Sequence, residues 1–206
     1  MNVQEATTRR LPDLKERHLP ENCRETINTI LKETYGYEQF RNLEIYDDLS
    51  KGKEKLCISQ GQLIENVILE AEKAWKSETQ VDNILLTAPT GSGKSLLFQL
   101  PAIYLGKEYN LLTIVVSPLK ALIVDQVESL QELGYARVAY ASSDLSPEQK
   151  MEVYRQVREG EIDLFYLSPE LLLSYDIKHF VGERRIGLVV VCLLYTSDAA
   201  DDLIGV

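Results

Sequence analysis

The stretch Asn83-Ile-Leu-Leu-Thr-Ala-Pro-Thr-Gly-Ser-Gly-Lys-Ser-Leu-Leu-Phe-Gln-Leu100 decides the fold of this chain. Its first five residues have the apolar character of a buried strand, and leucines at helical spacing follow the loop. Gly91 and Gly93 lie between these two elements, where glycine lets backbone amides turn toward an anion. A strand, a glycine-rich loop ending in Lys-Ser and a helix together form the setting of a P-loop, which binds nucleoside triphosphates.

The P-loop pattern assigns a task to each residue of the loop. Lys94 is expected to reach the β- and γ-phosphates, and the hydroxyl of Ser95 to ligate Mg²⁺. Backbone amides at the start of the next helix point at the same place. Ala88 stands where the pattern usually has glycine, and a fortuitous Lys-Ser after a glycine-rich turn is the alternative. We expect ATP and Mg²⁺ as cofactors, held by Thr90, Gly91, Ser92, Gly93, Lys94 and Ser95, with Ser95 as the metal ligand.

Strands and helices alternate along the rest of the chain. Apolar strands are predicted at 83–87, 112–116, 137–141, 163–167 and 187–191, with amphipathic helices between them and another at 62–76. Ser146-Pro-Glu-Gln149 has the form of a capping box, with proline at the first helical position. Alternation of this kind predicts parallel pairing through right-handed crossovers. The fold class is therefore α/β, a parallel-sheet P-loop domain preceded by a mostly helical N-terminal extension.

Composition excludes several classes of protein. A hydrophobic fraction of 45% and a charged fraction of 26% are those of a globular chain, and no apolar run is long enough to cross a bilayer. We expect a cytoplasmic protein without membrane association. No metal-like spacing connects the cysteines and histidines, which are Cys23, Cys57, Cys192, His18 and His179.

The net charge of −10 argues mildly against a nucleic-acid binder, because such proteins usually carry a basic face. However, a strand can also be held by backbone amides and small hydroxyl side chains, which need no net positive charge. Charge alone therefore decides nothing.

Several motifs resemble those of superfamily 2 helicases, and of RecQ-like DNA helicases in particular. Ala88–Ser95 is similar to motif I, in which alanine is common at the first position, and Leu96–Ala102 is similar to the helix that follows it. Val116-Ser-Pro-Leu-Lys-Ala-Leu122, continuing to Asp125-Gln-Val127, resembles motif Ia. Ala141-Ser-Ser143 and Leu167-Ser-Pro-Glu-Leu171 resemble the later strand-contacting motifs. The resemblance covers about residues 84–191.

This resemblance implies the first RecA-like domain of an ATP-dependent helicase or translocase, acting on DNA more than on RNA. The two Ser-Pro pairs follow predicted strands, so they belong at the carboxyl edge of the sheet, where α/β proteins bind ligands. Each pair could instead be a simple helix N-cap. The residues expected near a nucleic-acid strand are Ser117, Pro118, Lys120, Ser143, Ser168 and Pro169.

Adenine recognition has two candidate segments. Gln62, in the segment Gly61–Ile68, resembles the glutamine that pairs with the base in these helicases. Gly36-Tyr-Glu-Gln-Phe-Arg41 resembles the aromatic-arginine part of the same RecQ element, but it lies early, and Glu44 stands where that glutamine is expected. Either an insertion splits the element or one match is accidental; Gln62 could also be a plain helix-start residue.

The end of the chain departs from the helicase pattern. By the resemblance, strand 187–191 should lead into Asp-Glu-Ala-His, which holds Mg²⁺ and polarises water, but Cys192-Leu-Leu-Tyr follows. The segment from Cys192 to Asp201 can be encoded by the end of a transposase adapter used in DNA library preparation. We therefore divide the chain into a helical extension at 1–55, a partial RecA-like ATP-binding domain at 56–191 and a probable non-native tail at 192–206. We expect no catalytic residue in this fragment, which should fold poorly and hydrolyse nothing itself.

Two other functions remain open at this stage. A DEAD-box-type RNA helicase would share motif I, and the Ser-Pro-Leu and Asp-Gln-Val elements favour the RecQ-like assignment over it. An ATP-gated nucleic-acid clamp or sensor would have an ATPase stimulated by single strands without displacing a duplex. Protein partners cannot be inferred from the sequence.

Overall fold

The structure is a computed structural model that describes residues 17–46, 55–76, 83–84 and 93–192. Within these ranges, no helix combines the length and the apolar character that crossing a membrane requires. The strand expected at 83–87 and most of the P-loop lie outside the described residues, as do residues 193–206 of the expected tail.

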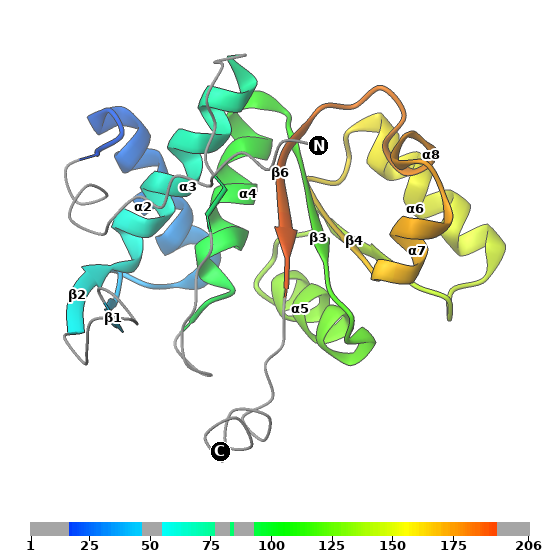
Figure 1. Ribbon diagram of the computed structural model, residues 1–206, viewed down its shortest axis with the longest axis horizontal. Helices are drawn as coiled ribbons and strands as arrows, with labels where there is room; N and C mark the ends of the chain where they lie inside the picture. Colours follow the sequence, from blue (N-terminus) through cyan, green and yellow to red (C-terminus); the bar gives the residue numbers. More distant parts are fainter. Residues whose placement is uncertain (1–16, 47–54, 77–82, 85–92, 193–206) are drawn as a thin grey trace, which may run out of the picture.

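A four-stranded parallel sheet forms the centre of the molecule (Figure 1). Its strands lie in the order β4 (Val138–Ala141), β5 (Leu164–Leu167), β3 (Leu112–Val116) and β6 (Ile186–Val191). All three strand pairs are parallel, and β3 lies between β5 and β6. The predicted α/β class and parallel pairing are therefore confirmed.

Helices pack on both faces of this sheet because the side chains of each strand alternate in direction. On β5, Phe165 and Leu167 pack with α6 (Pro147–Glu159) and α8 (Ile177–Val181), whereas Leu164 and Tyr166 pack with α4 (Leu96–Tyr109) and α5 (Lys120–Glu132). A short helix, α7 (Pro169–Ser174), connects β5 to α8.

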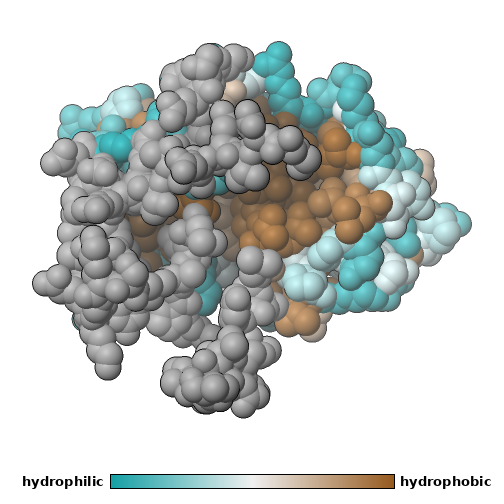
Figure 2. Space-filling model, in the orientation of Figure 1, coloured by the Kyte–Doolittle hydropathy of each residue, from teal (hydrophilic) through white to brown (hydrophobic). Residues whose placement is uncertain are grey.

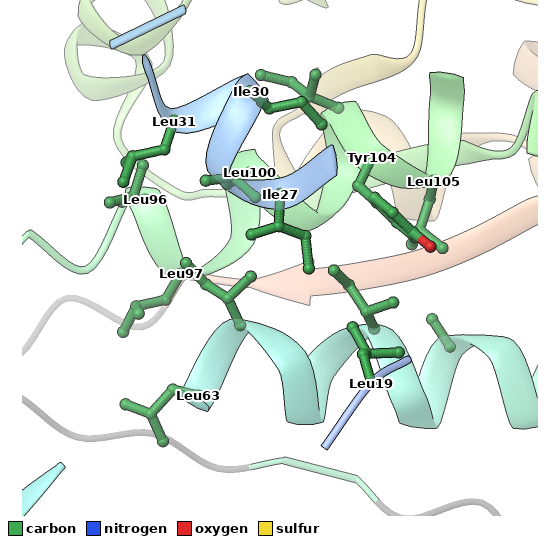
Figure 3. Close-up of a cluster of buried hydrophobic side chains, with 14 of the residues drawn as sticks. Leu19, Ile27, Ile30, Leu31, Leu63, Leu96, Leu97, Leu100, Tyr104 and Leu105 are labelled. Atoms are coloured by element: carbon green, nitrogen blue, oxygen red, sulfur yellow. The ribbon is translucent and has the colours of Figure 1, made fainter. Parts of the chain in front are cut away.

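The N-terminal helix α2 (Glu21–Tyr35) shares a hydrophobic core with α3 (Gln60–Trp75) and α4 (Figure 3). Ile27 and Leu31 of α2 are almost fully buried in this cluster, which also holds Ile64 of α3. This helix lies within the predicted helical extension and packs directly on α4, the helix that follows the P-loop. A domain boundary near residue 55 stays a prediction.

One element differs from the sequence-based expectation. Strands β1 (Asn42–Tyr46) and β2 (Lys55–Ser59) form an antiparallel hairpin where helix and loop were expected. Five residue pairs are in register, from Asn42 opposite Ser59 to Tyr46 opposite Lys55. Both strands do carry apolar residues at every second position, Leu43 and Ile45 in β1 and Leu56 and Ile58 in β2, but each run is too short to stand out in a polar segment.

Local signals placed most helix boundaries correctly. The predicted capping box is present: the hydroxyl of Ser146 accepts from the backbone N–H of Gln149, whose side chain accepts from the N–H of Ser146. Gly134, two residues past the end of α5, has φ of 86°, a left-handed value that glycine adopts without strain.

Strand β6 lies at the edge of the described sheet and keeps apolar side chains in contact with solvent. Val189 is 56% exposed and Val191 62% exposed. Figure 2 shows an apolar area at the centre of the view, where β6 runs in Figure 1. Within the described residues, an apolar edge strand of this kind is a site for pairing with another strand.

A cluster of charged side chains around a buried carboxylate lies at the amino ends of the strands. The carboxylate of Asp163, just before β5, accepts from Arg184 at 3.0 Å and from Arg137 at 2.6 and 2.8 Å, and the hydroxyl of Tyr135 donates to it at 2.9 Å. The side chains of Asp163 and Arg184 are only 3% and 5% exposed. The cluster therefore connects the starts of β4, β5 and β6 by charge-assisted hydrogen bonds.

We predict that Arg184→Met lowers the free energy of unfolding by about 3 kcal/mol, because it leaves a buried carboxylate short of a partner. Urea denaturation of the chain measures this. Arg155→Met is the matched control, since Arg155 makes only exposed ion pairs along α6. Equal losses in the two variants would contradict a special role for the buried cluster.

Candidate nucleotide site and nucleic-acid edge

The end of the P-loop is the first part of the site. Gly93 has φ of 78°, and its carbonyl accepts from Leu96 at the start of α4. Ser95 occupies the N-cap position of α4 but makes no side-chain capping hydrogen bond, and the first turn holds no acidic residue. This helix start is therefore electrostatically suited to a phosphate. Thr90, Gly91 and Ser92 lie outside the described residues.

Lys94 and Cys192 are close enough to interact electrostatically. Burial raises the pKa of the Cys192 thiol, and the nearby ammonium group of Lys94 partly opposes that rise. Cys192 directly follows β6, and its N–H donates to the carbonyl of Val116 at 2.9 Å. The backbone after β6 thus lies beside the end of β3, and Cys192 is within electrostatic reach of Lys94.

The hairpin brings together two segments that lie far apart in the sequence. Arg41 precedes β1 and Gln60 follows β2, yet the N–H of Gln60 donates to the carbonyl of Arg41 at 2.9 Å. The N–H of Arg41 in turn donates to Oε1 of Gln60 at 3.1 Å, and Nε2 of Gln60 lies 3.5 Å from the carbonyl of Gly93. The structure therefore places Gln60 between the aromatic-arginine segment and the P-loop.

The aromatic-arginine segment presents a flat surface beside Gln60. The guanidinium of Arg41 lies 5.9 Å from the ring centroid of Tyr37, which is half exposed. Gly61 packs so closely on Phe40 that an added Cβ would lie 2.6 Å from the ring. This contact requires glycine next to Gln60 and fixes the start of α3 against the segment.

Gln62, the glutamine predicted from sequence, occupies a different position. It is half-buried on α3, its carbonyl accepts from Nδ2 of Asn66, and it lines a hollow of about 320 Å³ together with Arg24 and Asn28 of α2. Gln60 approaches the P-loop through the carbonyl of Gly93. With the hairpin residues 42–59 set aside, Gln60 is the first residue after Arg41 and Gln62 is the third, which is the spacing expected for the glutamine of the RecQ element.

The carboxyl edge of the sheet carries an exposed polar cluster. The ammonium of Lys120 donates to the hydroxyl of Ser143 and, at 2.9 Å, to the carboxylate of Asp144. Lys150 donates to the carbonyl of Ser143 at 3.5 Å. Hydrogen bonds from its own backbone and from Ser168 lower the pKa of the Glu170 carboxyl, and the positive charge of Lys120 lowers it further. Residues following β3, β4 and β5 therefore meet at this edge.

The two serines of the Ser-Pro pairs are buried. Ser117 is 2% exposed; its N–H donates to the carbonyl of Leu167, and its hydroxyl has no hydrogen-bond partner within the described part of the chain. The hydroxyl of Ser168 accepts from the N–H of Leu171, so it caps α7 with Pro169 at the first helical position. Pro118 is exposed beside Lys120. Three of the residues predicted to contact nucleic acid are therefore exposed to solvent: Pro118, Lys120 and Ser143.

Comparison with known proteins identifies the family. The model of the DEAD/DEAH box helicase family matches residues 69–191, more than half of the chain. The chain therefore belongs to the DEAD/DEAH box helicase family.

Individual relatives confirm the RecQ-like resemblance. An ATP-dependent DNA helicase RecQ of Synechocystis sp. is 32% identical over 170 residues, which cover 82% of this chain and 29% of the relative. The ATP-dependent DNA helicase RecQ of Bacillus subtilis is 30% identical over 163 residues, covering 79% and 22%. The ATP-dependent helicase SGS1 of Saccharomyces cerevisiae is 36% identical over 124 residues, covering 58% and 8%. The chain spans less than a third of the length of each of these relatives.

Proposed function

We propose that this chain is the ATP-binding part of an ATP-dependent DNA helicase or translocase of the RecQ type. One observation carries the proposal: Lys120 follows β3 and Ser143 follows β4 at the carboxyl edge of one parallel sheet. Lys94 is within electrostatic reach of Cys192, which follows β6 at the same edge. A nucleotide and a polynucleotide would then bind to adjacent loops of a single rigid scaffold. Hydrolysis in the full-length protein would drive movement along a strand.

In this proposal the P-loop residues hold the triphosphate. The backbone from Thr90 to Gly93 cradles it, Lys94 contacts the β- and γ-phosphates, and Ser95 ligates Mg²⁺, which would neutralise developing charge on the phosphates. The left-handed Gly93 and the uncapped start of α4 support this arrangement. Cys192 cannot take the place of the carboxylates, so we assign no catalytic residue to this fragment.

We assign adenine recognition to Gln60 together with Tyr37 and Arg41. The contacts of Gln60 with Arg41 and Gly93 support this assignment. The ring of Tyr37 and the guanidinium of Arg41 provide the flat, cationic surface on which a base can stack. Gln62 is retained as the alternative.

DNA is the proposed nucleic-acid partner, because the relatives with the widest coverage of this chain are named as DNA helicases. An RNA helicase and an ATP-gated clamp without unwinding are the remaining candidates, and duplex displacement on each substrate separates them. We also propose a cytoplasmic location, supported by three cysteines that all remain unpaired.

We predict that Lys94→Ala abolishes ATP turnover in the full-length helicase, because the ammonium group would no longer neutralise phosphate charge. Phosphate release assays with single-stranded DNA measure the rate. Lys107→Ala, at the far end of α4, is the control and should keep turnover. Normal hydrolysis by the Lys94 variant would refute the nucleotide assignment.

The adenine assignment predicts different effects for two neighbouring glutamines. Gln60→Ala should raise the KM for ATP by about tenfold, because a site built to hydrogen-bond the base loses that contact. Gln62→Ala should leave the KM within about twofold of wild type. The reverse order would restore Gln62 as the reader of the base.

The Lys120–Asp144 pair predicts opposite charge effects on DNA binding. Lys120→Ala should weaken binding of single-stranded DNA and reduce the slope of log affinity against log salt by about 1. Asp144→Asn should strengthen binding at low salt, because it removes a negative charge that pairs with Lys120. Fluorescence anisotropy measures both, and changes in the same direction would contradict an electrostatic role for this edge.

A further inference from the structure

Gln99 is a buried amide inside the helix that follows the P-loop. It is 5% exposed, and its backbone N–H donates to the carbonyl of Ser95 at 2.9 Å, so it lies one turn beyond the P-loop. Its neighbours on α4 include Leu96, Leu100 and Ile103, which are apolar and buried. An amide in such surroundings costs free energy unless its hydrogen bonds are made.

The side-chain amide of Gln99 forms three hydrogen bonds, each to a different helix or strand. Its Nε2 group donates to Oε1 of Gln126 at 2.8 Å and to the hydroxyl of Tyr166 at 3.2 Å, which uses both amide hydrogens. The hydroxyl of Tyr35 donates to Oε1 of Gln99 at 3.3 Å. Burial raises the pKa of Tyr35 and of Tyr166, so both remain protonated at any working pH.

Each partner belongs to an element that leads into part of the candidate site. Tyr35 ends α2, directly before the segment that carries Tyr37 and Arg41. Gln126 lies on α5, which begins at Lys120. Tyr166 lies on β5, two residues before Ser168, and pairs in register with Val115 of β3, which leads to Ser117.

We propose that Gln99 is a positioning residue that couples the nucleotide end of α4 to the DNA-binding edge. A displacement of α4 on phosphate binding would move Gln99, and its partners must follow or lose buried hydrogen bonds, which is costly in a low-dielectric interior. The inference rests on the proposed function. It differs from a packing role, because an apolar side chain would fill the same space without connecting these elements.

Substitutions of Gln126 test the coupling without altering the P-loop. Gln126→Met removes the acceptor while keeping the volume, and Gln126→Glu keeps an acceptor for the amide of Gln99. In the full-length helicase we expect Gln126→Met to reduce the stimulation of ATP turnover by single-stranded DNA about fivefold or more, the range typical of coupled sites. The DNA-independent rate and the KM for ATP should stay near wild type, and Gln126→Glu should restore most of the stimulation.

Two further variants separate coupling from lost stability. Tyr109→Phe is the matched control. It removes a partly buried hydrogen bond, 2.8 Å long, from the Tyr109 hydroxyl of α4 to the carboxylate of Glu72 on α3, and this bond does not involve α5 or β5. It should lower thermal stability about as much as Gln126→Met yet keep the stimulation. Gln99→Met should lose stimulation, and adding Gln126→Met to it should cause little further loss, because both remove the same bond.

The outcomes are distinguishable. Full stimulation in Gln126→Met, or equal loss in Gln126→Met and Gln126→Glu, overturns the coupling role of Gln99. Equal loss in Tyr109→Phe overturns it as well, by showing a general effect of stability. A wild-type protein that hydrolyses ATP without any response to DNA instead refutes the proposed function, and the inference with it.

Discussion

Parallel pairing of β3 with β5 on one side and β6 on the other is the constraint on which the site depends. Because parallel strands end at the same edge, the loops after β3, β4, β5 and β6 must meet there. Lys120, Ser143 and Cys192 follow three of these strands, and the charge of Lys94 reaches Cys192. At the amino ends of the strands, the Asp163 cluster joins the starts of β4, β5 and β6. These hydrogen bonds help to fix the strands, and the strands in turn position the loops at their carboxyl ends.

The proposed nucleic-acid site would respond to local charge more than to the acidic total of the chain. The net charge of −10 is an average over the molecule, whereas a strand responds to the groups within about 10 Å, the screening length in dilute salt. At the carboxyl edge, Lys120 and Lys150 lie close to Ser143, but Asp144 neutralises part of this charge. Glu170 opposes the remaining charge, so binding of a polynucleotide there would depend largely on hydrogen bonds from backbone amides and hydroxyl groups.

Most of the sheet could be predicted from sequence because its signals are local. Strand 112–116 was placed correctly, and the Ser146–Gln149 capping box marks the start of α6. The site was harder to predict, since accessibility depends on tertiary packing. Ser117 and Ser168 were predicted to contact a nucleic-acid strand, yet both are buried and Ser168 caps α7. The contact between Arg41 and Gln60 could not be predicted, because 19 positions separate the two residues and only the β1–β2 pairing brings them together.

The hairpin shows why such an insertion leaves the nucleotide element intact. Its two ends are joined by hydrogen bonds in both directions between Arg41 and Gln60, so the inserted residues leave and re-enter at one point. The entropy of closing a loop grows only slowly with its length, and antiparallel pairing of β1 with β2 offsets part of that cost. Gly61 then allows Phe40 to pack against the start of α3. The geometry of Arg41, Gln60 and Gly93 thus depends on these end contacts, and the length of the segment between them is free to vary.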